Sequence, residues 1–367
     1  MKIDAAVVRE VGGPFTIESL VLDDPRPDEV IVRLTSVGIC HTDIGFQQGF
    51  LPVPMPFVLG HEGAGVVERV GTEVTRLAIG DHVVLSFDTC GRCVTCRSGH
   101  PSYCLEFAAR NISGGRPDGS PTVHDDAGSV VHAGFFAQSS FATHALVTER
   151  SAVKVDDTAD LGLVGPLGCG LQTGAGTVLN RLRPAAGSSI AVFGAGGVGL
   201  AAVMAAKAAG CAVIIAVDRT PSRLELAREL GATHTIDANQ TESVPEAVRA
   251  IVPLGVDNAL DTTAVTSVVR DAVSSLAPLG TCAVLGMGKG GTNVEVDMVE
   301  LIMSGRTIMG VMEGDVQPQD FVPLLVRMHA EGRFPFDKIV KTYPFTDINQ
   351  AIEDAESGRV IKPVLLF

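Results

Sequence analysis

The chain has 367 residues, a length that accommodates two domains with separate hydrophobic cores. Hydrophobic residues make up 46% of it and charged residues 19%, which is typical of a globular protein and excludes a disordered one. With 42 acidic and 28 basic residues the net charge is −14, so a phosphate-rich partner such as nucleic acid or an anionic membrane would be repelled.

No signal peptide is expected at the N-terminus. Residues 1–6 lack the charged and then apolar arrangement of a signal peptide. The most apolar stretch, residues 190–217, is interrupted by glycines and by Lys207, so no membrane-spanning segment is expected. We therefore expect a cytoplasmic protein, in which clustered cysteines are more often metal ligands than disulfides.

Residues 1–85 alternate short apolar runs with turns. Residues 5–8 and 30–34 are predicted strands separated by turns rich in glycine and proline, and residues 63–85 continue the pattern. Many short strands at regular spacing favour a small β-barrel or a sandwich.

Cys40 and His61 carry the side chains that zinc prefers in a site with mixed ligands. Cys169 is our candidate for a third ligand, and three protein ligands would leave one position open, as in a catalytic zinc site. The Thr42 hydroxyl would lie near whatever the metal binds, and Asp43 would accept the second ring proton of His61 and fix its tautomer. The alternative is that Cys40 and His61 are ordinary packed residues, because short motifs give false matches.

Four cysteines follow at the spacing C-x2-C-x2-C-x7-C: Cys90, Cys93, Cys96 and Cys104. Four thiolates within this short segment can close a tetrahedral shell around one zinc and leave no open position, which predicts a structural site. An iron–sulfur cluster is the alternative metal centre that the spacing allows, and four unrelated buried cysteines are the remaining alternative.

The segment after these cysteines has the composition of a loop. Residues 105–135 are rich in glycine, proline, aspartate and serine and are predicted to form a long surface loop. Residues 135–141 contain three phenylalanines, and we expect them to form a strand.

From about residue 165, strands alternate with helices. Residues 190–193 form a predicted strand, residues 200–209 a helix and residues 212–217 a second strand. The first strand and the helix are joined by G-x-G-x-x-G, made of Gly194, Ala195, Gly196, Gly197, Val198 and Gly199. The first glycine of such a motif allows a tight turn, the second allows a pyrophosphate to approach the backbone, and the third allows the helix to pack closely on the strand. The motif therefore predicts a dinucleotide-binding site. A strand–helix–strand unit without a ligand is the alternative.

Asp218 ends the second strand and is placed to accept hydrogen bonds from both hydroxyls of an adenosine ribose. Its charge would repel a 2′-phosphate, so NAD is favoured over NADP. Arg219 and Arg223 follow closely, and an arginine there can hold a 2′-phosphate, so NADP is the alternative.

The remaining chain continues the alternation. A helix is predicted at residues 221–230, and strands at 233–236, 256–260 and 281–285 extend a parallel sheet. The last predicted elements are an edge strand at 307–312, helices near 320–331 and 347–357, and a strand at 363–366.

Together these motifs resemble the zinc-dependent, medium-chain alcohol dehydrogenases, and the resemblance covers essentially the whole chain. It rests on the order of Cys40, the G-H-E sequence at 60–62, the four-cysteine segment, Cys169 and the glycine motif. The segments most similar to the aryl-alcohol (benzyl alcohol) dehydrogenase branch are residues 40–43, 135–143 and 165–176.

The resemblance implies an α/β plus β architecture with two domains. A GroES-like β-barrel catalytic domain would comprise residues 1–165 and 314–367, with a structural-zinc lobe at 90–104. A Rossmann domain, a doubly wound parallel sheet that binds NAD, would comprise residues 166–313, with the substrate cleft between the two domains. The family pairs subunits through the last strand of the cofactor sheet, so residues 307–312 favour a homodimer or homotetramer.

The resemblance also implies roles for the residues that match the family's motifs. The catalytic zinc would be bound by Cys40, His61 and Cys169, and the structural zinc by Cys90, Cys93, Cys96 and Cys104, which gives two zinc ions per chain. Glu62 would lie behind the catalytic metal and bind it transiently during ligand exchange, and Thr42 would accept the alcohol proton. His41 would lie near the cofactor pyrophosphate and Thr173 beside the nicotinamide.

One position departs from the family's pattern. Liver-type members carry a histidine five residues after the first zinc cysteine, and this histidine passes the proton to solvent. Here that position is Gly45. Our hypothesis is that His41 ends the proton relay instead, because an imidazole exchanges protons near neutral pH.

The implied activity is alcohol oxidation, in which zinc would lower the pKa of the alcohol and NAD would accept the hydride. Leu51, Phe87 and Phe135 match substrate-site positions and favour aromatic or allylic primary alcohols, oxidised reversibly to aldehydes, unless these residues are simply core. Alternatives are a same-fold enzyme for terpenoid alcohols such as geraniol, for polyols or for thiol adducts of formaldehyde. A non-enzymatic, crystallin-like NAD-binding protein is less favoured, because all seven zinc-ligand positions are filled.

Overall fold

The computed structural model describes all 367 residues, and the chain divides into two compact units. Unit 1 comprises Met1–Gly170, Gln317–Arg327 and Phe336–Phe367, and unit 2 comprises Leu171–Val316 and Met328–Pro335. The helix α10 (Pro318–Ala330) is therefore shared between them.

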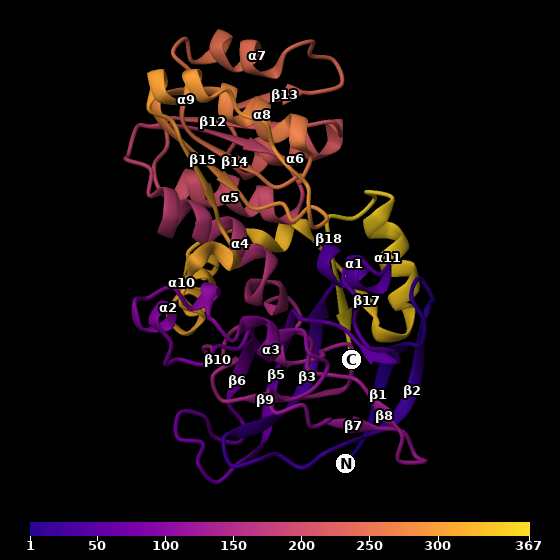
Figure 1. Cartoon of the computed structure of the whole chain (residues 1–367). Helices are drawn as coiled ribbons and strands as arrows, with labels where there is room; N and C mark the ends of the chain where they lie inside the picture. Colours follow the sequence, from indigo (N-terminus) through magenta and orange to yellow (C-terminus); the bar gives the residue numbers. More distant parts are fainter. The chain divides into compact units, whose positions relative to one another are not determined.

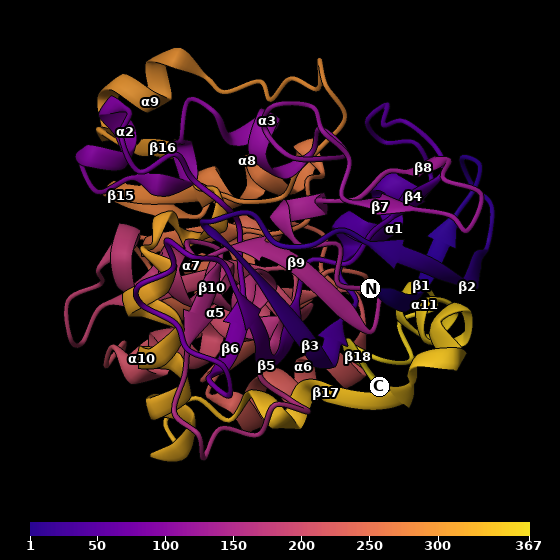
Figure 2. The same cartoon turned by 90° about the horizontal axis from the view of Figure 1, so that it is seen from below.

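Unit 1 is built on two sheets of short strands (Figures 1 and 2). The first sheet has the order β4 (Phe57–Val58), β1 (Lys2–Val8), β2 (Phe15–Leu22), β7 (Val123–His124) and β8 (Val130–Val131). The second has the order β10 (Ala152–Lys154), β6 (His82–Leu85), β5 (Gly63–Val70), β3 (Glu29–Gly38), β18 (Lys362–Leu366) and β17 (Val340–Pro344), with β9 (His144–Thr148) paired to β3. All pairings are antiparallel except that of β17 with β18.

The helices of unit 1 are few and short. They are α1 (His41–Gln47), α2 (Val94–Arg97), α3 (Phe107–Asn111), α11 (Ile348–Glu356) and single turns of 3₁₀-helix, which include η1 (Pro101–Tyr103), η2 (Phe135–Ala137), η3 (Gly165–Gly168), η6 (Phe336–Ile339) and η7 (Phe345–Asp347). Figure 1 shows α11 beside β17 and β18, the two strands that flank it in the sequence. The core of the unit is rich in phenylalanine, and Phe57, Phe135 and Phe141 are wholly enclosed.

Two predictions for this unit were incomplete or wrong. The loop predicted at 105–135 also contains α3, β7 and β8. The strand predicted at 135–141 is a 3₁₀ turn followed by an irregular segment, in which Phe136, Ala137 and Ser139 have φ values of 49°, 57° and 54°. A strand requires negative φ, and left-handed backbone at three residues rules it out. The Ser139 hydroxyl fixes the turn, because it accepts from the Phe135 N–H at 3.0 Å and donates to the Val58 carbonyl at 2.5 Å.

Unit 2 is a six-stranded parallel sheet with helices packed against it (Figure 1). The strand order is β13 (His234–Asp237), β12 (Val213–Asp218), β11 (Ser189–Phe193), β14 (Val256–Asp261), β15 (Leu276–Val284) and β16 (Thr307–Gly310). The first strand of unit 2, β11, lies in the middle of the sheet. The next two strands, β12 and β13, extend the sheet on one side of β11, and the chain then crosses to the other side and forms β14. The carboxyl ends of β11 and β14 therefore lie at a topological switch point, where doubly wound folds bind their ligands.

The helices of unit 2 connect these strands. They are α4 (Gly170–Gly176), the π-helical turn η4 (Thr177–Leu182), α5 (Gly197–Ala208), α6 (Pro221–Leu230), α7 (Val244–Ile251), α8 (Thr266–Ser274), α9 (Met298–Ser304) and the short turn η5 (Glu313–Asp315). The sheet face that carries Ala191, Phe193 and Ile215 forms one core with the buried side chains of α7 and α8. No helix of the chain has both the length and the apolar composition needed to cross a membrane.

Candidate active site

Four side chains of types that can bind a metal ion come from distant parts of unit 1 and meet in its interior. Cys40 immediately precedes α1, His61 and Glu62 immediately precede β5, and Cys169 follows η3. Their ligand atoms all lie within 4.8 Å of one another, and all except Cys40 are buried. We call these four residues the mixed cluster, because they combine two thiols, an imidazole and a carboxylate.

The imidazole of His61 is held by the residue that was predicted to orient it. The fully buried Asp43 places its Oδ1 2.8 Å from His61 Nδ1, and its carboxylate also accepts the backbone N–H groups of Cys40 and Gly60 at 2.9 and 3.0 Å. The other ring nitrogen, Nε2, is buried and has no hydrogen-bond partner. Buried polar atoms are rarely left unpaired, and a metal ion on Nε2 would satisfy it. The donor set and this unpaired nitrogen therefore fit zinc.

The ionisable groups of the mixed cluster shift one another's pKa values. Hydrogen bonding from Cys169, aided by His61, holds the pKa of the Cys40 thiol well below its ordinary value. Burial opposes a charged imidazole, but the Asp43 carboxylate and the Cys40 thiolate outweigh it and raise the pKa of His61 well above its ordinary value. Thiolate and carboxylate groups thus surround the His61 ring, an arrangement that would stabilise a bound cation.

Lys362, which the sequence pattern did not indicate as a site residue, contacts the mixed cluster through Glu62. Lys362, at the start of β18, is buried and places its Nζ 2.9 Å from each carboxylate oxygen of Glu62. Burial, aided by the nearby Cys40, raises the pKa of Glu62 above its ordinary value, although the Lys362 ammonium opposes that rise. The only signal in the sequence was a lysine within an otherwise apolar terminal strand.

Aromatic side chains surround the imidazole of His61. Phe136 stacks on its ring at 4.5 Å between centroids, and Phe135 meets the ring edge-on at 5.4 Å. Phe107 lies 6.1 Å from Phe136, and Phe87 lies 5.9 Å from Phe107. We call Phe87, Phe107 and Phe136 the aromatic row. Phe107 and Phe136 were not predicted as site residues.

The predicted pocket residues occupy different environments. Phe135 is completely buried, Phe87 is 2% exposed and Leu51 is half-buried against the same core. Their role in substrate binding stays a prediction, which Phe135 fits least, because none of its surface reaches solvent in this structure.

The predicted proton-relay residues lie on α1. The Thr42 hydroxyl is 3.7 Å from Cys40 Sγ and is half-buried. His41 is the first residue of the helix and is exposed to solvent. A side chain at Gly45 would contact Phe50 at 3.6 Å. Of the two relay candidates, Thr42 thus lies beside the mixed cluster and His41 lies at the surface.

The four-cysteine lobe forms the second candidate metal site. The sulfur atoms of Cys90, Cys93, Cys96 and Cys104 lie within 4.8 Å of one another. Backbone N–H groups of Arg92 and Cys93 donate to Cys90 Sγ at 3.5 and 3.3 Å, and that of Cys90 donates to Cys104 Sγ at 3.2 Å. Hydrogen bonds, of which that with Thr95 has the largest effect, lower the pKa of Cys93 to about 5. Burial raises the pKa of Cys96 to about 12. A cation shared by all four sulfurs would stabilise their thiolates together.

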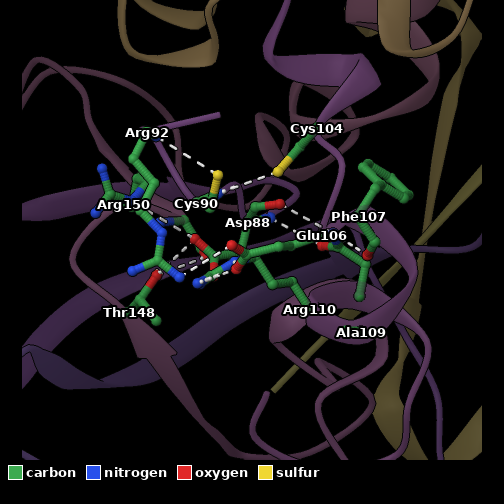
Figure 3. Close-up of polar contacts among 12 residues, drawn as sticks. Asp88, Cys90, Arg92, Cys104, Glu106, Phe107, Ala109, Arg110, Thr148 and Arg150 are labelled. Atoms are coloured by element: carbon green, nitrogen blue, oxygen red, sulfur yellow. Dashed lines mark hydrogen bonds and ion pairs between the residues drawn. The ribbon is translucent and has the colours of Figure 1, made fainter. Parts of the chain in front are cut away.

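A buried aspartate ties this lobe to the barrel (Figure 3). The Asp88 carboxylate is 2.8 Å from Arg110 Nη1 and accepts the Thr148 hydroxyl at 3.1 Å. Its backbone N–H and carbonyl are both bonded to the Asn111 amide, at 2.8 and 2.9 Å. These contacts anchor both ends of the lobe, because Asp88 precedes Cys90, and α3, which carries Arg110 and Asn111, follows Cys104.

The glycine motif of unit 2 has the geometry of a phosphate-binding turn. Gly194 has a φ of 94°, and a Cβ on it would lie 2.3 Å from Thr262 Oγ1. A Cβ on Gly199 would lie 1.8 Å from the Gly194 carbonyl oxygen, so helix and strand approach too closely for a side chain. At Gly196, by contrast, nothing lies within 4 Å. This open space above the N-terminus of α5 fits a pyrophosphate.

Asp218 ends β12 beside this turn. Its carboxylate accepts the N–H groups of Ala195 and Thr220 at 2.7 and 2.8 Å. Arg219 is exposed, and the Nε of the half-buried Arg223 has no hydrogen-bond partner. Thr173, the residue predicted beside the nicotinamide, lies on α4, with its hydroxyl 3.5 Å from the Glu313 carboxylate.

Two protein-family descriptions match this chain, one in its N-terminal half and one in its C-terminal half. Residues 26–157 match the family described as Alcohol dehydrogenase GroES-like domain, and residues 197–330 match Zinc-binding dehydrogenase. The chain is 44% identical over 363 residues to geraniol dehydrogenase of Castellaniella defragrans, covering 99% of this chain and 97% of that protein. The chain belongs to the zinc-binding, medium-chain alcohol dehydrogenase family.

Two solved structures resemble this alcohol dehydrogenase along its whole length. An alcohol dehydrogenase zinc-binding domain protein from Burkholderia ambifaria is 51% identical with a TM-score of 0.99, and covers 100% of this chain and 99% of that chain. Benzyl alcohol dehydrogenase from Acinetobacter calcoaceticus is 44% identical with a TM-score of 0.97, with the same coverage. The predicted family and the predicted fold, a GroES-like barrel with a Rossmann sheet, are confirmed.

Proposed function

We propose that this alcohol dehydrogenase oxidises aromatic, benzyl-type, or allylic primary alcohols to aldehydes, reversibly, with NAD as the hydride acceptor and zinc at Cys40, His61 and Cys169. The observation that carries the substrate class is the aromatic row beside His61. Aromatic rings attract a flat π-system in edge-on or offset contact more strongly than they attract an aliphatic chain. A benzyl or allyl group next to the metal-bound imidazole is therefore the best match.

Two relatives support the same class of substrate. The Acinetobacter structure is named for benzyl alcohol and the Castellaniella protein for geraniol, which is an allylic terpenoid alcohol. In both alcohols the carbon that loses hydride is adjacent to a π-system. Geraniol is thus a second candidate within the same proposal, whereas no observation on this chain favours a polyol or a formaldehyde–thiol adduct.

The chain's own residues divide the remaining work. Zinc, when bound, lowers the pKa of the alcohol, and NAD, when bound, takes the hydride. Asp43 fixes the His61 ring so that Nε2 faces the metal position. Thr42 lies near that position and accepts the alcohol proton, and the exposed His41 releases it to solvent.

The relay has its own test. A His41→Gln variant should lose most of its turnover near neutral pH while it keeps zinc and NAD binding, because glutamine cannot exchange a proton. A small external base that does not bind zinc should restore part of the rate. Unimpaired turnover in the variant would show that the proton leaves by another route.

On the cofactor side we propose NAD, bound by the glycine motif and Asp218. The Asp218 carboxylate lies at the end of β12, where ribose hydroxyls donate and a 2′-phosphate is repelled. We further propose a second, structural zinc in the four-cysteine lobe.

We also propose a homo-oligomer. The side chains of Met298, Ile302 and Met303 on α9 are 71%, 70% and 82% exposed, and the edge strand β16 follows this helix directly. Apolar side chains grouped in this way mark an interaction surface. A Met303→Lys variant should shift the mass measured by light scattering to that of a smaller species, and an unchanged mass would place the interface elsewhere.

The proposed activity is tested by NADH formation at 340 nm with benzyl alcohol, geraniol, ethanol and a polyol, each with NAD and with NADP. The proposal predicts the highest kcat/KM for benzyl alcohol or geraniol with NAD. A higher value for ethanol or a polyol would contradict the aromatic pocket. No turnover on any of them, with two zinc ions present, would point to a thiol adduct instead.

A matched pair of variants tests the aromatic row itself. Phe107→Ala should lower kcat/KM for benzyl alcohol relative to 1-hexanol by about three- to tenfold, the effect expected from one lost aromatic contact. Phe367→Ala, an exposed phenylalanine at the C-terminus, is the control and should leave the ratio unchanged. Equal ratios in both variants would remove Phe107 from the substrate site.

A further inference from the structure

A lysine ammonium is enclosed beside the mixed cluster. Lys362 is 5% exposed, and its Nζ bonds both oxygens of Glu62 at 2.9 Å and the carbonyl oxygen of Ile39 at 3.1 Å. An ammonium has three donors, so all of them are used. Two of its three partners are the oxygens of one carboxylate, so the ammonium and Glu62 form a buried ion pair.

The position of the Glu62 carboxylate is also built into the backbone. A Cβ on Gly38 would lie 2.1 Å from Glu62 Oε2, so only glycine leaves room for the carboxylate there. The N–H of Gly170 donates to Oε1 at 3.1 Å. Glu62 itself has no exposed surface, so water cannot solvate its charge.

This carboxylate presents a problem for a catalytic metal site. The four donors of the mixed cluster lie within 4.8 Å of one another, enough to close a tetrahedral shell around one ion. A closed shell has no position for an alcohol. The thiolates of Cys40 and Cys169 already balance the two charges of a zinc ion, so the buried Glu62 needs another cation, and Lys362 is that cation.

We propose that Lys362 holds Glu62 off the metal and thereby keeps the fourth coordination position open to the alcohol. Lys362 is thus a positioning residue that acts through Glu62. The proposal rests on the proposed zinc site, but it concerns the coordination number of the metal and not the identity of the alcohol. Without the ammonium, the buried carboxylate has one remaining donor and one accessible cation, which is the metal.

The test uses full-length protein with cobalt(II) in place of zinc, because cobalt has visible absorption bands that change when an outside ligand binds. Imidazole is the probe for an open position. The wild-type spectrum should shift with added imidazole, whereas Lys362→Met should bind imidazole at least tenfold more weakly and lose about ten- to a hundredfold in kcat. Lys362→Arg, which keeps the charge, should respond to imidazole as the wild type does.

A double variant separates the proposed role from a general loss of structure. Glu62→Gln combined with Lys362→Met removes both charges, so the imidazole response should return although Lys362 is still missing. Lys341→Met is the matched control, because Lys341 lies on the neighbouring strand β17 and pairs with Asp354 at the surface. It should leave the imidazole response unchanged.

Two results would overturn the proposal. One is a Lys362→Met protein that binds imidazole as tightly as the wild type, and the other is a double variant that stays as insensitive as the single one. Lys362→Gln, which keeps a donor but loses the charge, supplies the same test if the methionine variant does not accumulate as folded protein. If cobalt wild type binds imidazole but oxidises no alcohol, the proposed function fails while this proposal is still tested by the spectra.

Discussion

The two cysteine-containing clusters of unit 1 differ in how their ligands are collected. The four-cysteine lobe takes all its sulfurs from one short segment, Cys90–Cys104, and all four donors are alike. The mixed cluster draws on Cys40, on His61 with its neighbour Glu62, and on Cys169, which are far apart in the chain, and its donors differ in charge and softness. The first arrangement can only close a shell, whereas the second leaves the number of ligands adjustable.

The two clusters also differ in the kind of group that supports their ligands. Backbone N–H groups support the sulfurs of the lobe, and the Asp88 contacts anchor its ends (Figure 3). Buried charged side chains, Asp43 and Lys362, support the mixed cluster. A structural site thus needs fixed geometry, while a catalytic site also needs its charge and its open position controlled.

The largest expected effect comes from removing one cysteine at each cluster. Cys40→Ser should lower kcat at least about a thousandfold with little change in Tm, because only the catalytic metal is lost. Cys104→Ser should keep measurable turnover but lower Tm by about 6–12 °C, as expected for a loss of about 3 kcal/mol. Zinc content, Tm and NADH formation check the pair. If both variants lost the same property, the two clusters would not have distinct roles.

Asp88 tests whether the lobe is a separate structural element. Asp88→Asn removes a carboxylate that is 1% exposed and faces Arg110, so we expect a cost of about 2–4 kcal/mol and a Tm lower by about 4–16 °C. The kcat of the folded enzyme should stay within about twofold of wild type. Calorimetry and steady-state rates check this prediction. A large fall in kcat at constant Tm would show that the lobe contributes to catalysis and is not only a structural element.

Asp43 is the corresponding test at the mixed cluster. Asp43→Asn keeps the shape but no longer fixes the His61 tautomer or stabilises its charge, so zinc affinity or kcat should fall about ten- to a hundredfold. Competition with a chromogenic chelator measures the affinity. Asp156→Asn, a surface aspartate that bonds only to Thr158 in its own turn, is the control. Equal affinities in the two variants would argue that Asp43 has no part in binding the metal.

The smallest effect is expected at Asp354 on α11, whose partners Tyr343, Gln350 and Arg359 belong to neither cluster, and it sets the baseline. The Asp354 carboxyl has a pKa well below its ordinary value. The hydrogen bond from Tyr343 has the largest effect, and those from Arg359 and Gln350 add to it. A carboxyl with a lowered pKa in the folded state stabilises the protein above its unfolded pKa of about 3.9, and this contribution is lost as pH falls toward the folded pKa. Asp354→Asn should therefore lower Tm at pH 7, and the difference from wild type should shrink below about pH 4. A difference that did not change with pH would show that Asp354 acts through shape alone.

The sequence predicted the two clusters unequally for physical reasons. The spacing of the lobe cysteines is local, so it already indicates a metal site. Cys40 and His61 signal zinc only by their chemistry, and Lys362 could not be found, because it lies 300 residues from Glu62 and only the pairing of β18 with β3 brings them together. Phe136 was missed for another reason: left-handed backbone places its ring on His61, and a run of apolar residues does not reveal such a turn.

The most direct test of the account is to follow zinc content, Tm and benzyl alcohol oxidation together during slow removal of metal by a chelator. The account predicts two zinc ions per chain at the start. Loss of the zinc at the mixed cluster should abolish NADH formation while Tm changes little, and loss of the lobe zinc should lower Tm. Undiminished oxidation by metal-free protein, or a single zinc that supports both activity and Tm, would contradict the assignment of two different metal sites.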